Sequence, residues 1–426
     1  MAIILFGTLA VLLILNIPIA VSMGLASFAA IVFSGSATPL TMVPQRMFTS
    51  MDSFPFMAIP FFMLAGSLME SGGISRRLIN FAKNLVGFLP GGLGVITVVS
   101  SAFFGAISGS NAATVAAIGG VMIPAMEKDK YPKDLASAIA ASSGTLGVVV
   151  PPSVPMITYG VISNVSIAAL FMAGFLPAAL IITSLTVLMF FQAKKLNLHR
   201  LPFSGSELLK SFLDAFWALM MPVIILGGIY GGVFTPTEAA AVAVLYGLIV
   251  SLFIYGELRI DMLPGIIVRA GLGTAIVLFI IATSSGFAWL LTAAKVPSTI
   301  AASVLAISNN KYAILMLLNV TLLIFGIFLE TNAIILLLTP MLLPIAAQIG
   351  LDPLLLGVII VINTSVGMIT PPMALNIFIA SSVGGETIER ISAKIIPFLI
   401  VLVIDVLLIT YFPAISMWLP QVTGLI

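Results

Sequence analysis

The triplet Ser110-Asn111-Ala112 returns almost unchanged as Thr331-Asn332-Ala333, each time inside a long apolar stretch. A Gly-x-x-x-Pro-Pro run follows each triplet, from Gly147 to Pro152 and from Gly367 to Pro372. The spacing between the triplets matches the spacing between the Pro-Pro pairs to within one residue. Polar groups and helix breaks that recur in two halves of an apolar chain are typical of a binding site formed by interrupted membrane helices.

The composition places the chain in a lipid bilayer. Of its 426 residues, 61% are hydrophobic and 8% are charged, and the mean hydropathy is +1.25. Soluble domains carry about 25% charged residues, so this chain could not present a wettable surface. Long apolar runs indicate helices, because the strands of a membrane barrel would alternate over about 10 residues. We therefore predict an all-α polytopic membrane protein.

The composition also argues against an enzyme. There is no cysteine, which excludes thiol catalysis and thiolate metal sites. The single histidine, His199, stands in a polar loop beside Lys195 and Arg200 and is expected to be solvated. An intramembrane hydrolase would need a nucleophile with its base or a metal cluster, and no P-loop for ATP occurs. The net charge of +2 gives no indication of a nucleic acid partner.

Apolar segments long enough to cross a bilayer recur along the chain, since a spanning helix needs about 20 apolar residues. The first, Ile3–Phe33, is long for one crossing and carries Asn16 and Pro18, so we expect it to be tilted, kinked or split. The other predicted spans are Phe54–Met69, Leu135–Ile162, Ile167–Phe191, Phe212–Tyr230, Glu238–Tyr255, Ile266–Leu291, Leu354–Val383 and Ile395–Trp418.

Two longer segments, 94–126 and 313–347, have a small polar apex between two apolar arms. The first apex is Ser108-Gly109-Ser110-Asn111 and the second is Glu330-Thr331-Asn332. Each arm is short for a crossing of its own, so we predict re-entrant helical hairpins whose apices stop near the middle of the membrane. Backbone at that depth is tolerated only where it lines a cavity or is buried in protein.

Cationic loops indicate how the two halves are oriented. Lysine and arginine residues flank the first hairpin and recur in the central loop, whereas the second hairpin has only Lys311 before it. We therefore predict that the hairpins enter the membrane from opposite faces and belong to inverted repeats. The predicted units are a first repeat 1–195 (arm helix 71–90, broken helix 135–162), a linker with an extra transmembrane helix 196–235, and a second repeat 236–426 (arm helix 291–310, broken helix 354–383).

The first apex and the first Pro-Pro break offer neutral oxygen atoms to a cation. Pro151 and Pro152 have no N–H, so the carbonyl groups four residues earlier lose their helical partners, and Gly147 frees the backbone further. With the hydroxyl groups of the apex, these carbonyls can surround a hard monovalent cation such as Na⁺. For any single hydroxyl, the alternative is a bond to its own helix backbone. The second half repeats the set with Thr331, Asn332, Thr364, Ser365, Gly367, Thr370, Pro371 and Pro372.

The half-helices beyond each apex and each break begin inside the membrane. Their N-termini carry partial positive charge and free N–H groups, which favours an anionic substrate such as a carboxylate. Three acidic residues stand in apolar surroundings and are functional candidates by default. Glu330 could tune ion affinity, Glu238 could favour the start of a helix capped by Thr237, and Asp405 could pair with another helix or subunit. A channel is the alternative, but duplicated hairpins favour alternating access over a continuous pore.

Two further stretches resemble a known family. Asp52-Ser53-Phe54-Pro55, with Ile59-Pro60-Phe61-Phe62-Met63-Leu64-Ala65-Gly66, is one, and Gly231-Gly232-Val233-Phe234-Thr235-Pro236-Thr237-Glu238-Ala239-Ala240-Ala241 is the other. With the apex and Pro-Pro motifs, they resemble the large membrane subunit of tripartite ATP-independent periplasmic (TRAP) transporters over essentially the whole chain. The resemblance implies a secondary transporter of the bacterial inner membrane that takes up organic acid anions such as C4-dicarboxylates or sialic acid.

The resemblance also implies coupling to two or more Na⁺ ions, elevator-type movement of a transport domain against a scaffold, and two partners. The partners would be a separate small four-helix membrane subunit and a periplasmic substrate-binding protein. Carried over by motif, one Na⁺ site would comprise Ser108, Ser110, Gly147, Val150 and Pro152, and the other Thr331, Gly367, Thr370 and Met373. The substrate is expected to contact Asn111, Ser153, Asn332 and Asn376.

Overall fold

The computed structural model describes residues 1–35, 38–196, 202–307 and 310–426, and all regular secondary structure in these residues is helical. Eight helices in it are long and apolar enough to span a membrane, and a ninth span is possible if a bent pair counts as one. This confirms the predicted all-α polytopic class. His199, predicted to be solvated in a polar loop, lies outside the described residues.

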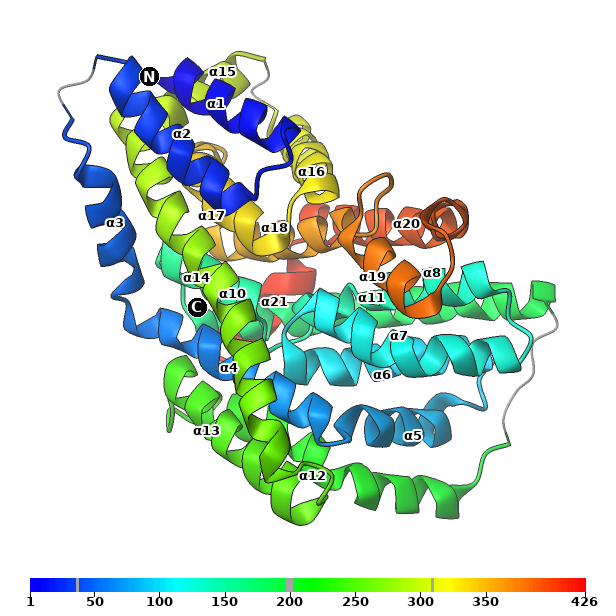
Figure 1. The fold of residues 1–426 in the computed structure, drawn as a ribbon. Helices are drawn as coiled ribbons and strands as arrows, with labels where there is room; N and C mark the ends of the chain where they lie inside the picture. Colours follow the sequence, from blue (N-terminus) through cyan, green and yellow to red (C-terminus); the bar gives the residue numbers. More distant parts are fainter. Residues whose placement is uncertain (36–37, 197–201, 308–309) are drawn as a thin grey trace.

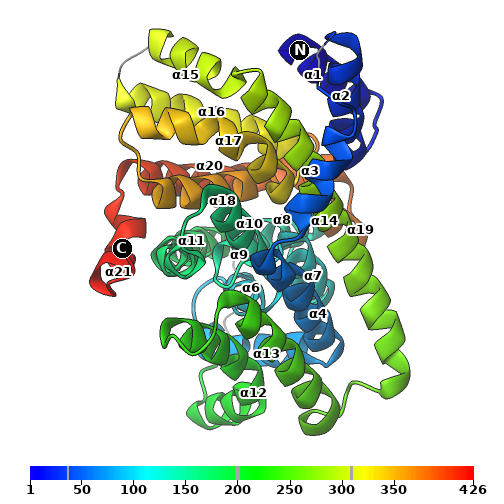
Figure 2. The same cartoon turned by 90° about the vertical axis from the view of Figure 1, so that its left-hand side faces the viewer.

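An outer group of helices comes from the N-terminal quarter and the middle of the chain. The long helix α14 (Leu263–Ala293) runs obliquely along this group, as Figures 1 and 2 show, and packs against α2, α3 and α4. The other members are α1 (Ala2–Ile14), α2 (Ile19–Phe33), α3 (Met42–Met51), η1 (Phe54–Met57), α4 (Ala58–Ser71), α12 (Gly205–Tyr230), α13 (Pro236–Ile249), the π-helical turn η2 (Val250–Ile254) and η3 (Ile260–Met262).

A central group mixes helices from both halves of the chain. For example, α10 packs against α17 and α18, and α7 packs against α19. Two helices connect the groups: α5 (Ile74–Val86) and α15 (Val296–Ile307). The central members are α6 (Gly92–Ser108), α7 (Asn111–Lys128), α8 (Lys133–Ser143), α9 (Leu146–Val149), α10 (Val154–Ser163), α11 (Ile167–Leu196), α16 (Lys311–Phe328), α17 (Thr331–Gln348), α18 (Pro353–Gly367), α19 (Leu375–Gly384), α20 (Ile388–Tyr411) and α21 (Ala414–Val422).

Each polar apex joins two helices whose far ends lie together. At the base of α6 and α7, the Tyr131 hydroxyl donates to the carbonyl of Gly91 at 2.8 Å. At the base of α16 and α17, the Lys311 ammonium donates to the carbonyl of Gly350 at 3.1 Å. Figure 1 shows α7 and α17 leading away from the middle of the molecule toward different edges. The two pairs are therefore helical hairpins, and their inverted symmetry stays a prediction.

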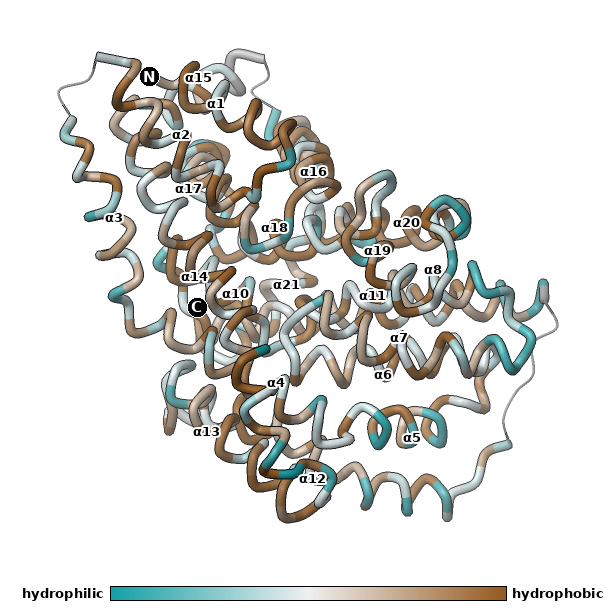
Figure 3. Tube along the Cα trace, in the orientation of Figure 1, coloured by the Kyte–Doolittle hydropathy of each residue, from teal (hydrophilic) through white to brown (hydrophobic). Residues whose placement is uncertain are grey.

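Hydrophilic segments gather where α7 and α11 end, at the right-hand edge of Figure 3. Ion pairs join the elements that meet there: Lys133 lies 3.7 Å from Glu127, and Lys394 lies 3.9 Å from Asp134. This is the end of the molecule that the cationic loops assign to the cytoplasm.

The expectation that Ile3–Phe33 is tilted, kinked or split is confirmed. The segment is two helices, because Asn16 adopts a left-handed conformation (φ 60°) just before Pro18. Other predicted bounds were wrong. The predicted span Ile395–Trp418 breaks after Tyr411, next to Pro413. The hairpin arms α16 and α17 have 18 residues each, longer than expected, because the prolines inside α17 do not end it. Membrane helices tolerate proline where neighbouring helices satisfy the freed backbone groups.

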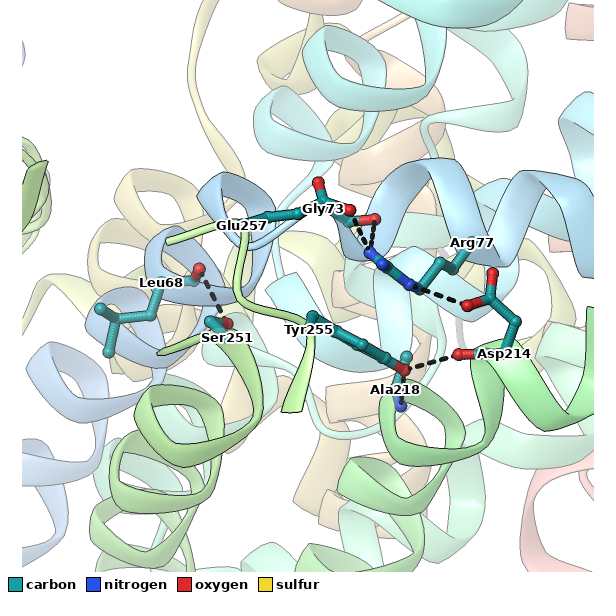
Figure 4. A network of polar contacts seen from close by, with 8 residues as sticks. All are labelled: Leu68, Gly73, Arg77, Asp214, Ala218, Ser251, Tyr255 and Glu257. Carbon is teal, nitrogen blue, oxygen red and sulfur yellow. Dashed lines mark hydrogen bonds and ion pairs between the residues drawn. The ribbon is translucent and has the colours of Figure 1, made fainter. Parts of the chain in front are cut away.

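Arg77 anchors the connecting helix α5 to the outer group (Figure 4). Its guanidinium binds Glu257 at 2.6 Å and Asp214 of α12 at 3.2 Å, and also donates to the Gly73 carbonyl. The same guanidinium stacks 3.9 Å above the ring of Tyr255, whose hydroxyl donates to the Asp214 carbonyl. Planar guanidinium is suited to this combination of paired carboxylates and an aromatic face.

Replacing Arg77 should loosen this anchor without touching the centre of the molecule. Arg77→Gln leaves the Glu257 and Asp214 carboxylates without their shared partner, at an expected cost of about 1–3 kcal/mol. The purified protein in detergent should then unfold several degrees lower than the wild type. The matched control is Arg76→Gln, because Arg76 is exposed and makes no ion pair within the described chain. Equal melting temperatures for both variants would refute the anchoring role.

Candidate functional site

A cavity of about 180 Å³ lies where the two hairpin apices meet. Four helices begin at its wall: α7 at Asn111, α10 at Val154, α17 at Thr331 and α19 at Leu375. The outer group closes one side through α4 and α14. The residues lining the cavity are Met63, Gly66, Ser67, Glu70, Phe104, Ser108, Gly109, Ser110, Asn111, Ala112, Ala113, Val148, Val154, Pro155, Val277, Glu330, Thr331, Asn332, Met368 and Leu375.

The first apex folds its oxygen atoms toward one another. Gly109 takes the left-handed conformation that ends α6 (φ 59°), and Ser110 then caps α7 by accepting from the Ala113 N–H. The Thr114 hydroxyl donates to the Ser110 carbonyl at 2.8 Å and lies 3.1 Å from the Ser108 hydroxyl. Two predicted ion ligands, Ser108 and Ser110, are thus neighbours. Sequence reasoning missed Thr114, which the Ser110-x-x-x-Thr114 spacing on one helical face could have revealed.

The first break packs directly against this apex. A Cβ added to Gly147 would lie 2.4 Å from the Ser110 carbonyl oxygen, and one added to Gly109 would lie 3.2 Å from the Pro152 carbonyl oxygen. Only glycine permits such close approach. The structure therefore brings the apex close to Gly147 and Pro152, which the predicted ion site requires. Half-buried Val150 follows α9 in the same break.

Asn111 joins the two halves of the molecule. Its side-chain carbonyl accepts from the Val148 N–H at 3.1 Å, and its amide donates to the Ser365 hydroxyl at 2.8 Å. That hydroxyl in turn donates to the Thr145 carbonyl at 3.0 Å. Asn111 lines the cavity, but its polar atoms already have protein partners, so its main effect is to hold α7, α9 and α18 in place.

The second apex makes a comparable set of contacts. The Thr331 hydroxyl lies 3.3 Å from that of Thr364 and 3.4 Å from the sulfur of Met368. Asn332 accepts from the Thr158 hydroxyl of α10 at 3.2 Å and donates to the Glu330 carboxylate at 2.9 Å. This apex is therefore fixed to the broken helix of the first half.

The second break is more open than the first. The Gly367 carbonyl accepts from the Thr370 N–H at 2.9 Å, and the Met368 carbonyl accepts from the Asn376 N–H at 3.0 Å. The side chain of Met373 is 53% exposed and does not line the cavity. Of the second predicted ion set, Gly367 ends α18, and Thr331 contacts Thr364 of the same helix. The Thr370 hydroxyl donates to the Val366 carbonyl at 3.0 Å.

Two other predicted substrate contacts are buried polar side chains, and each has an atom without a hydrogen-bond partner in the described chain. Ser153, just before α10, is 1% exposed, and its hydroxyl has no partner within the described chain. Asn376 donates to the Ala141 carbonyl at 3.2 Å, while its own side-chain oxygen has no described partner. Neither residue lines the cavity, so their contact with the substrate stays a prediction.

The three acids singled out from the sequence occupy different surroundings. Glu330 lines the cavity. Asp405 accepts a hydrogen bond from Ser184 of α11, so it pairs with another helix of its own chain. Glu238 forms a capping box with Thr235. The expectation that Thr237 caps this helix was wrong, because its hydroxyl donates to the Phe54 carbonyl instead.

Comparison with known proteins identifies the family. Residues 6–415 match the DctM component of the tripartite ATP-independent periplasmic transporters. The C4-dicarboxylate TRAP transporter large permease protein DctM of Pseudomonas aeruginosa is 40% identical over 92% of this chain and 94% of its own. The sialic acid TRAP transporter large permease protein SiaM of Vibrio cholerae is 38% identical over 98% and 97%. The isethionate permease protein DctMQ of Oleidesulfovibrio alaskensis is 44% identical over 97% of this chain and 66% of its own.

Solved structures share the fold at low sequence identity. The Alcanivorax borkumensis YdaH transporter aligns with a TM-score of 0.64 and 15% identity over 86% of this chain and 87% of its own. Neisseria gonorrhoeae MtrF aligns with a TM-score of 0.61 and 13% identity over 90% and 85%. The family match covers nearly the whole chain, and the apex motifs and the cavity agree with it. This chain therefore belongs to the large membrane subunits of the TRAP transporters.

Proposed function

We propose that this chain is the translocating subunit of a Na⁺-coupled importer for an organic acid anion. It would work in the bacterial inner membrane with a small four-helix membrane subunit and a periplasmic protein that delivers the substrate. The observation that carries the proposal is the meeting of four helix N-termini, those of α7, α10, α17 and α19, at one cavity. Their partial positive charges and free N–H groups favour a bound anion.

The relatives support an organic anion as the substrate class. Their names give C4-dicarboxylates, sialic acid and isethionate. These compounds share an anionic oxygen group and differ in the rest of the molecule. The described cavity wall offers hydroxyl groups, amides, methionine and two acids rather than a cationic clamp, so we infer that the delivering protein selects the substrate.

Neutral oxygen atoms beside the cavity support Na⁺ as the coupling ion. The carbonyl oxygens of Gly147 and Val148 lack helical donors, since Pro151 and Pro152 have no N–H. Gly147 itself packs against the cluster of Ser108, Ser110 and Thr114, since a Cβ added to it would meet the Ser110 carbonyl oxygen and the Thr114 hydroxyl. Hard cations prefer oxygen ligands, and a cation here would also reduce the cost of moving an anion into the membrane.

Alternating access would follow from movement of the central group against the outer group. The hairpins and broken helices that line the cavity all belong to the central group, whereas α4 and α14 belong to the outer group. Sliding one group past the other would carry the cavity from one face of the membrane to the other, which is the elevator mechanism.

Uptake into proteoliposomes tests the coupling. Succinate, N-acetylneuraminate and isethionate should each be offered with the binding protein and small subunit encoded beside this chain. At least one should accumulate only with the binding protein and an outside-high Na⁺ gradient. An inside-negative potential should accelerate uptake, since each net positive charge gains about 2.3 kcal/mol per 100 mV. Equal uptake in Na⁺ and in K⁺ would contradict the proposal.

Thr114→Val tests the first ion site with little change in shape. The substitution removes a hydroxyl that lies between Ser108 and Ser110, so the Na⁺ concentration for half-maximal uptake should rise by roughly tenfold. Thr183→Val is the matched control, because the Thr183 hydroxyl donates to the Ala179 carbonyl of its own exposed helix face. A similar Na⁺ dependence in both variants would count against this site.

A further inference from the structure

A second, polar pocket adjoins the cavity, and none of the predicted ligands lines it. Ser67 and Glu70 of α4 line the cavity, and both also line a pocket of about 450 Å³ with Ser71 and Arg269. We call this pocket, formed by these four residues, the vestibule. Because the vestibule and the cavity share two residues of one helix, the two spaces adjoin along α4.

Arg269 differs from Arg77 and Arg259, two other arginine residues near this end of the molecule. Arg77 binds Glu257 and Asp214, and Arg259 binds Asp261. Arg269 makes no hydrogen bond or ion pair with any described residue, although Glu70 is near enough for their charges to attract. A guanidinium within a membrane-spanning helix normally has a partner or a function.

Charge also distinguishes the vestibule from the cavity. Among the described residues, Arg269 is the single cationic side chain that lines either space, and the cavity itself carries two acids, Glu70 and Glu330. An organic anion held in the cavity by helix N-termini would therefore find a fully charged, five-donor group only in the vestibule.

The position of the vestibule assigns it to one face. Ser71 ends α4, two residues before Gly73 of the Arg77 anchor, and Arg269 lies in the second turn of α14, just after Arg259 and Asp261. The cationic loops predict that the α5 region lies on the cytoplasmic side. In that orientation, the vestibule lies on the cytoplasmic side of the cavity.

We propose that Arg269 forms a transient site for the anionic group of the substrate during release to the cytoplasm. Glu70 competes with the substrate for the same guanidinium, which keeps residence short. Ser67 and Ser71 supply hydroxyl groups to the same oxygen atoms. This inference rests on the proposed function and adds a positively charged release site on the outer group, outside the moving hairpins.

Inhibition of uptake by internal substrate tests the site. Proteoliposomes are loaded with increasing concentrations of whichever of succinate, N-acetylneuraminate or isethionate the wild type transports, and Na⁺-driven uptake is measured. For Arg269→Gln, the internal concentration that halves uptake should rise by roughly tenfold, because a charge-assisted bond is lost. For Glu70→Gln, the same concentration should fall, because the competing carboxylate is gone.

Controls separate this inference from the proposed function and from misfolding. Arg259→Gln removes a cation at the same end of the molecule that lines neither space, and it should behave as the wild type. Arg269→Lys keeps the charge and should give an intermediate value. If Arg269→Gln does not assemble, the internal inhibition measured for Arg269→Lys and Glu70→Gln tests the release site instead. Wild-type transport with unchanged internal inhibition in these variants would overturn the release site alone, whereas no wild-type transport would overturn the proposed function as well.

Discussion

The carboxamide of Asn111 holds together the structure on which the cavity depends. Each helix interruption frees backbone groups at a depth where water is scarce, and unsatisfied groups there cost several kcal/mol. Asn111 satisfies the Val148 N–H beside the first break and reaches Ser365 of the second half. One side chain therefore fixes an apex, a broken helix and the opposite repeat in a single arrangement.

The two breaks satisfy their backbone groups differently, and this asymmetry bears on function. Around the first break, the chain is buried and glycine residues bring carbonyl groups close to the apex. Around the second, the Met368 carbonyl is already bonded to the Asn376 N–H, and Met373 is exposed. For the proposed Na⁺-coupled transport, a preorganised first site and a second site completed by rearrangement would be compatible with a cycle of binding and release.

Much of the site could be predicted from sequence because its signals are local. Pro-Pro pairs remove backbone donors wherever they stand, and the Ser-Asn and Thr-Asn triplets interrupt long apolar runs. Thr158 and the vestibule could not be found this way, whereas Thr114 was missed although its spacing from Ser110 is a local signal. Thr158 looks like an ordinary helix hydroxyl until α17 places Asn332 against it, and Arg269 is one charge near a helix start until α4 brings Glu70 beside it. The short α3 was also missed, because its polar residues and length exclude a span.

The central claim is that the second apex lies against the broken helix of the first half. The chain has no cysteine, so Thr158→Cys with Asn332→Cys gives a clean pair at positions whose side chains lie 3.2 Å apart. A protease site inserted between residues 196 and 202 allows the halves to be separated after treatment with Hg²⁺ in native membranes. The double variant should stay joined while each single variant separates. Separation of the double variant, with both thiols shown to react, would contradict the shared cavity.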